Sequence, residues 1–126
     1  MNKYKILRSF FLTLVSLFFI AELFSQTPEG VKYQAVARDT SGSVLGNKTI
    51  KVKFRILSGP SQGTLEWEEV HDPVNTNEYG LFNVNIGKGS STGSGQKTAF
   101  DSLNWGEKVH YLNVRIDMGN GFEDLG

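Results

Sequence analysis

The feature that most constrains this sequence is an alternation of apolar and polar residues with a period of two. In the segment Thr49–Ile56, apolar residues from Ile50 onward alternate with lysine or arginine. Leu81–Ile86 and Val109–Asp117 repeat the pattern, with asparagine, arginine or aspartate at the polar positions. Successive side chains of a strand point to opposite faces of its sheet. Each segment therefore predicts a strand with one buried face and one solvent face.

Two further segments are predicted to be strands: Val31–Arg38, and Thr64–Val70 around Leu65 and Trp67. Clusters rich in glycine, serine, asparagine and proline indicate turns at residues 39–42, 58–63, 72–77 and 87–95. No segment after Gln26 has helical apolar spacing, although a single helical turn is expected within residues 99–105. We therefore expect an all-β fold, an antiparallel immunoglobulin- or transthyretin-like β-sandwich that follows an N-terminal signal-peptide helix.

The first 26 residues differ in character from the rest of the chain. Basic residues at positions 3, 5 and 8 precede an apolar run, Phe10–Ala21, and a small residue, Ser25. This order is typical of a secretory signal peptide, with cleavage expected after Ser25 or Gln26. An uncleaved membrane anchor is the alternative, but the run is shorter than the ~20 apolar residues that a spanning helix needs. We thus divide the chain into a signal peptide, residues 1–26, and a β-sandwich domain, residues 27–126.

Charge and composition exclude several classes of protein. The chain has 13 basic and 13 acidic residues. Removing the three basic residues and one acidic residue of the leader leaves ten basic and twelve acidic residues, a net charge of −2. This balance argues against a nucleic-acid partner. Without cysteine, the chain forms neither disulfides nor thiolate metal sites, and we expect no cofactor and no stable membrane insertion after leader cleavage.

Short motifs in the sequence do not add up to a catalytic site. The segment Gly89–Gly93 matches the G-x-S-x-G pattern, but a glycine- and serine-rich loop follows it rather than the helix of a nucleophile elbow. His71 and His110 show no paired metal-ligand spacing. We therefore expect no catalytic residue, no metal ligand and no enzymatic activity.

Two groups of side chains have the chemistry to act on a sugar or to bind one. Glu66 and Glu68 flank Trp67, and we interpret them as part of a solvent-exposed strand face rather than as a pair of catalytic carboxylates. Trp67 and Trp105 are candidate ligand-contact residues if their rings are exposed, because aromatic rings stack on sugars. In a domain of this size, large aromatic residues more often fill the core.

The C-terminal residues predict a hairpin that begins a further strand. Residues 118–121, Met-Gly-Asn-Gly, favour a tight turn, and Phe122 starts the next strand. A sheet that ended there would leave an unpaired edge, which folded proteins normally cover or shorten. We therefore expect that the domain is truncated at its C-terminal strand; a short edge strand is the alternative.

Several segments together resemble a known family. They are Tyr33–Asp39 (Tyr-Gln-Ala-Val-Ala-Arg-Asp), Val52–Gly59, Asn75–Gly87, and Leu103–Trp105 with Tyr111–Asp117. The sequence is similar in these segments to an N-terminal β-sandwich domain of exported and cell-surface proteins in Gram-negative bacteria that use type IX secretion. In that family the domain follows a signal peptide, precedes collagen-like or tail-fibre-like modules, carries no catalytic residues and closes with a further strand.

These observations set the functional expectations. We expect a non-catalytic structural spacer or assembly module, exported through its signal peptide to the extracellular space or outer cell surface. The alternative is an adhesin module that binds glycans or proteins, with other surface proteins or glycans as its partners. Turn loops at one end of the sandwich would then provide the binding surface.

Overall fold

The computed structural model describes residues 2–7, 29–59 and 63–125. Residues 3–7 are helical, and every other regular element lies between Val31 and Asp124. The proposed cleavage residues, Ser25 and Gln26, lie outside the described residues. Within the described part of the chain, no helix is long and apolar enough to cross a membrane.

Seven antiparallel strands form two sheets, which confirms the all-β, two-sheet prediction. The strands are β1 (Val31–Val36), β2 (Thr49–Ser58), β3 (Thr64–Asn75), β4 (Leu81–Ile86), β5 (Ser90–Ser91), β6 (His110–Asp117) and β7 (Phe122–Asp124). A short 3₁₀ helix, Phe100–Ser102, lies within the predicted helical turn.

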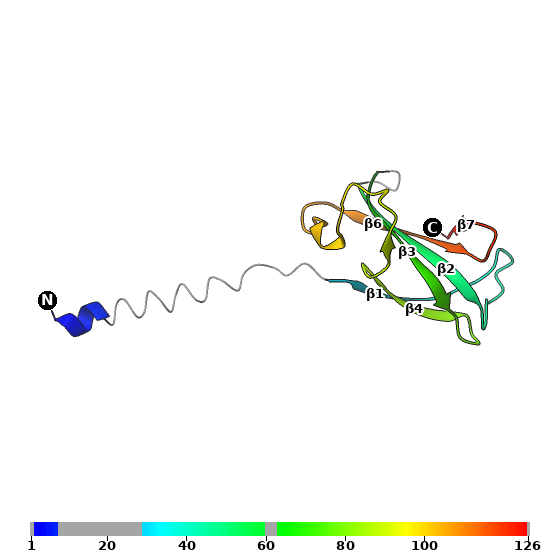
Figure 1. The fold of residues 1–126 in the computed structure, drawn as a ribbon, viewed down its shortest axis with the longest axis horizontal. Coiled ribbons are helices and arrows are strands. Elements are labelled where there is room, and N and C mark those ends of the chain that lie inside the picture. The colour runs from blue at the N-terminus through cyan, green and yellow to red at the C-terminus, as the bar shows by residue number, and fades with distance from the viewer. Residues whose placement is uncertain (1, 8–28, 60–62, 126) are drawn as a thin grey trace.

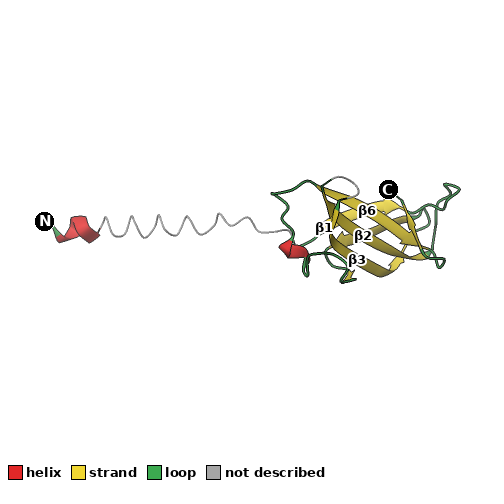
Figure 2. Ribbon diagram, turned by 90° about the horizontal axis from the view of Figure 1, so that it is seen from above, coloured by secondary structure: helices red, strands yellow, loops and turns green. Residues whose placement is uncertain are grey.

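The two sheets are unequal in size. One sheet has five strands in the order β5-β3-β2-β6-β7, and the other pairs only β1 with β4. Figure 1 shows β1 and β4 together on one side of the longer strands, and Figure 2 shows β3, β2 and β6 side by side. The large sheet is therefore covered by a layer of only two strands.

The core lies between the sheets and follows the alternation of the sequence. Every second residue of β2 from Ile50 to Ile56 is buried, as are Phe82 and Ile86 of β4. The ring of Tyr33 on β1 packs edge-on against Phe54 on β2, with the centroids 5.0 Å apart. Burial of these apolar side chains supplies the main favourable term in folding.

Strand β3 is longer than the sequence predicted. Residues 72–77 were interpreted as a turn, but β3 continues to Asn75, which pairs with Thr49. The ladder is irregular between Ile50 and Val52, opposite Pro73. Proline has no N–H to donate, so it is tolerated where pairing is already interrupted. The turn prediction was wrong for residues 72–75, because the pairing with β2 continues through them, whereas Asn77 does begin the turn that precedes β4.

Candidate functional site: the open side of the sandwich

One edge of β1 has no neighbouring strand among the described residues. The N–H of Ala37 donates to the carbonyl of Gly80, next in register after the β1–β4 ladder. Hydrogen-bonding directions alternate along a strand, so Tyr33 and Ala35 also point their backbone groups toward β4. The N–H and C=O groups of Lys32, Gln34 and Val36 consequently point away from β4, along the free edge.

Beside this edge, the inner face of the large sheet is left uncovered. Leu112 pairs with the buried Ile56, so both side chains point to the inner face, yet Leu112 is 41% exposed. Leu125 donates its N–H to the carbonyl of Val114, continues the inner face of β7, and is 54% exposed. On β1, Val31 is 41% exposed. Three apolar side chains that face the interior are thus open to solvent.

We call this region the open side, defined by the free backbone edge of Lys32, Gln34 and Val36 and by the apolar side chains of Val31, Leu112 and Leu125. A cavity of about 170 Å³ opens next to it. Its lining consists of apolar and aromatic side chains with one histidine: Val31, Ile56, Ile86, Trp105, His110, Tyr111 and Leu112. Val31, on the strand with the free edge, and Leu112 both line this cavity.

The two tryptophans predicted as ligand contacts have different places in the structure. Trp67 is buried at 5% exposure, packs against Phe100, and donates its indole N–H to Glu69, so neither face of its ring is available to a ligand. Trp105 is half-buried, stacks on Phe100 and His110, and lines the cavity. Its Nε1 is buried and has no acceptor among the described residues.

Two charged side chains flank the open side. Lys32 is exposed on the outer face of β1, opposite Asn85, and makes no ion pair with any described residue. Glu123 lies on the inner face of β7, because it pairs with the buried Ile116, and it is likewise exposed. A basic group therefore lies on the outer surface beside the free edge, and an acidic group lies on the inner face of the large sheet.

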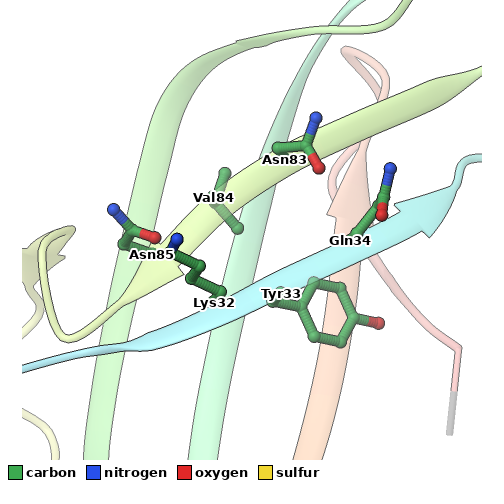
Figure 3. Close-up of a pocket in the computed structure, with 6 residues that line it drawn as sticks. All are labelled: Lys32, Tyr33, Gln34, Asn83, Val84 and Asn85. Atoms are coloured by element: carbon green, nitrogen blue, oxygen red, sulfur yellow. The ribbon is translucent and has the colours of Figure 1, made fainter. Parts of the chain in front are cut away.

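The outer face of the small sheet forms a polar trough of about 500 Å³. Lys32 lies opposite Asn85, and Gln34 lies opposite Asn83, so four polar side chains gather on one surface (Figure 3). None of these side chains forms a hydrogen bond with another described residue. The trough offers three amide groups and one ammonium group to a polar ligand.

A carboxylate lies in the middle of the core. Glu69 is 0% exposed, and its Oε2 accepts a hydrogen bond of 2.7 Å from Trp67 Nε1. The backbone N–H of Gly87 lies 2.8 and 2.9 Å from the two carboxylate oxygens, and His71 Nε2 lies 2.7 Å from Oε1. A buried carboxylate is tolerated when donors surround it in this way. This arrangement joins β3 to the end of β4 and gives Glu69 a structural role.

The neighbouring glutamates correct a second prediction. Glu66 and Glu68 were assigned to a solvent-exposed face, but both are buried. Glu66 accepts a 2.6 Å hydrogen bond from Ser58 Oγ, which holds the pKa of Glu66 below its ordinary value, with Lys108 contributing. Glu68 binds Arg55 at 3.0 Å and accepts a hydrogen bond from Thr92. The loop after β4 folds over this part of β3, which a strand pattern does not reveal.

Among the described residues, no hydrogen bond joins a serine of the G-x-S-x-G segment to either histidine. Ser91 lies on the short strand β5, where it pairs with Glu69. His110 packs against Trp105, whereas His71 binds Glu69. In the part of the chain that the structure describes, no three histidine, cysteine, aspartate or glutamate residues are grouped to hold a metal ion. Burial raises the pKa of the Tyr33 hydroxyl, which makes it a poorer acid.

A sequence model of one family matches residues 32–125, from the second residue of β1 to just beyond β7. The family is described as a Domain of unknown function (DUF8740). The chain belongs to this family. No curated protein and no solved structure matches the chain.

Sequence reasoning missed the main features of this DUF8740 domain for identifiable reasons. The free edge of β1 depends on which strands pair, and pairing is a long-range property. The role of Glu69 had a detectable signal, since Trp67, Glu69 and His71 occupy alternate positions of one strand and so share a face. That spacing placed a carboxylate on the same side as the buried indole.

Proposed function

We propose that this chain is a non-catalytic β-sandwich module of an exported, cell-surface protein, in which it serves as a structural spacer and assembly domain. The observation that carries the proposal is the open side. A spacer needs a rigid core, and an assembly domain needs an edge to which another piece of protein can be joined. The five-stranded sheet supplies the rigid core, and the free edge of β1 supplies the edge for joining another segment.

The polar groups of the interior support a structural role. A catalytic acid or base must reach a substrate, whereas Glu69 is fully enclosed by Trp67, His71 and Gly87. Glu66 and Glu68 are likewise bonded to side chains of the same domain. These carboxylates stabilise the sandwich and are not available as reacting groups.

Export is proposed from the leader and from the resemblance to type IX-secreted surface proteins. The test is to express residues 1–126 in a Gram-negative host and to measure the intact mass of the product. Loss of residues 1–25 or 1–26, with the product outside the cytoplasm, is the expected result. A full-length product retained in the membrane would instead identify the leader as an anchor, and one in the cytoplasm would contradict export.

The alternative function, a glycan-binding adhesin module, is favoured by the polar trough on the small sheet. Amide side chains such as Asn83 and Asn85 donate and accept hydrogen bonds, as sugar hydroxyls require. A glycan array with the purified chain separates the two proposals. The spacer predicts no saturable binding. Saturable binding that is lost in an Asn83→Ala, Asn85→Ala double variant, with an unchanged circular dichroism spectrum, would establish the adhesin instead.

A further inference from the structure

We propose that Asn120 is a site of spontaneous deamidation and that the carboxylate of Asp117 slows the reaction. The modification converts the asparagine to aspartate or isoaspartate through a cyclic imide formed with the backbone nitrogen of Gly121. This inference goes beyond the proposed function, because it concerns the covalent chemistry of the turn between β6 and β7, residues 118–121. It follows from the order of residues in the turn, their exposure, and the hydrogen bonds of Asp117.

The turn presents the asparagine and its attacking nitrogen with little steric hindrance. Asn120 is followed by glycine, whereas each of the other asparagines of the chain is followed by a residue with a side chain. Such a side chain hinders the approach of the backbone nitrogen to the amide carbon of the asparagine. Residues 118–121 are all exposed, and nothing lies within 4 Å of the position that a Cβ of Gly121 would occupy. Asn120 is therefore the asparagine at which this attack is least hindered.

The reaction needs only water and hydroxide as partners. Hydroxide removes the amide proton of Gly121, and the resulting nitrogen anion attacks the side-chain carbonyl carbon of Asn120. Because the two groups belong to neighbouring residues, this step is intramolecular. The new C–N bond closes the imide ring, and the Nδ2 group leaves and takes a proton from water to become ammonia. Water then opens the imide at either of its carbonyl carbons, which gives aspartate or, with the backbone routed through the side chain, isoaspartate.

Asp117 is placed to slow this reaction. Its Oδ1 accepts hydrogen bonds from the N–H groups of Gly119 at 2.6 Å and Gly121 at 2.9 Å. These two bonds lower the pKa of Asp117, and Lys51 lowers it further, so the carboxyl group is ionised at neutral pH. An ionised acceptor stabilises the protonated nitrogen of Gly121 and repels the anion that must form for the attack.

Deamidation would change the hairpin in two ways. Both products place a new negative charge beside Asp117, and isoaspartate also adds a methylene group to the backbone of the turn. Strand β7 has three residues and lies at the edge of its sheet. Its first pair, Phe122 with Asp117, adjoins the turn. The longer backbone of the isoaspartate product therefore loosens β7, beginning at this pair.

The test is to incubate the purified chain at mildly alkaline pH and to follow each asparagine by peptide mapping with mass spectrometry, which detects replacement of NH₂ by OH. Asn120 should convert first. Asp117→Ala should accelerate conversion at least about tenfold, the factor that corresponds to one hydrogen bond to an ionised group. Asp117→Asn keeps an acceptor without the charge and should give an intermediate rate.

A second turn carboxylate provides the matched control. Asp39 Oδ1 also accepts hydrogen bonds from two backbone N–H groups, those of Ser41 and Ser43. Asp39→Ala removes a carboxylate of the same kind from a turn that does not contain Asn120. It should therefore leave the rate of conversion at Asn120 unchanged.

Urea provides a measurement that needs no folded variant. Unfolding breaks the bond between Asp117 and Gly121, so Asn120 of the unsubstituted chain should convert at least about tenfold faster in urea than in the folded chain. Asp117→Ala should convert at that same rate in urea, because the effect of the carboxylate depends on the fold. This comparison keeps the test decisive if Asp117→Ala fails to fold.

Several outcomes would overturn the proposal. Faster conversion at any other asparagine of the folded chain would show that Asn120 is not the site. Equal rates in urea and in the folded chain, or equal acceleration by Asp39→Ala and Asp117→Ala, would refute the role of Asp117. Leader cleavage and glycan binding are measured separately, so these outcomes leave the proposed function unchanged.

Discussion

Substitution of the buried carboxylate Glu69 tests whether the polar network in the core stabilises the fold. In Glu69→Ala, the N–H groups of Trp67 and Gly87 lose their acceptor, and so does His71. Each unsatisfied buried donor costs about 1–3 kcal/mol. Two backbone or indole donors with no other acceptor therefore predict a loss of about 4 kcal/mol in the free energy of unfolding.

The isosteric variant Glu69→Gln separates hydrogen bonding from packing. The amide oxygen of glutamine can still accept from one or two donors, but its NH₂ group must face another donor. The expected loss is about 2 kcal/mol, half of that for alanine. Urea unfolding followed by circular dichroism measures both values. The exposed Glu123 provides the control, since Glu123→Gln should change the free energy by less than about 0.5 kcal/mol.

The reasoning is refuted if Glu69→Gln is as stable as the unsubstituted chain. That result would mean that the three donors find other acceptors or water, and that Glu69 is not the centre of the network. It would also contradict the structural role assigned to Glu69.

Three further substitutions test separate parts of the structure, each by urea unfolding. Gly87→Ala should cost about 3 kcal/mol, because the residue has a φ of 98° and a Cβ would lie 2.6 Å from the Phe100 ring. Ser58→Ala should destabilise the fold at pH 7 more than at pH 3. In the folded chain the pKa of Glu66 lies below the ordinary carboxyl pKa. The ionised Glu66 therefore stabilises the fold above the ordinary pKa, and this stability is lost as the pH falls through the pKa of the folded chain. Trp105→Phe should change the free energy by less than about 1 kcal/mol, because it removes an N–H that has no acceptor.

Matched variants serve as controls for these predictions. Gly106→Ala, where nothing lies within 4 Å of the added Cβ, should be nearly neutral, and a cost equal to that at Gly87 would contradict the steric argument. Trp67→Phe should cost about 2 kcal/mol, since Glu69 would lose a donor. Equal effects at Trp67 and Trp105 would contradict the distinction between them. A Ser58→Ala effect that does not depend on pH would remove Glu66 from the explanation.

Local periodicity predicted the strands well where one face is buried and the other is wet. The bounds of Leu81–Ile86 agree with the structure, and the strands predicted at Thr49–Ile56 and Val109–Asp117 differ from it by one or two residues. The strand around Trp67 was predicted too short. Its glutamates are buried by a loop from elsewhere in the chain, so the burial does not follow from their own spacing.

The candidate site was much less predictable than the strands. Gln34 and Val36 are ordinary strand residues in the sequence, and they become an edge only because no described strand lies beside β1. Leu112 fits the alternation of a buried face, yet it is exposed because the covering sheet has two strands. The immunoglobulin- or transthyretin-like topology and the export of the domain stay predictions.

The most direct test of the open side is amide hydrogen exchange of β1, measured residue by residue by NMR. The account predicts fast exchange at Lys32, Gln34 and Val36 and slow exchange at Tyr33 and Ala35, whose N–H groups face β4. If those three amides are already protected in the chain alone, the edge of β1 is not free, and the central claim is contradicted.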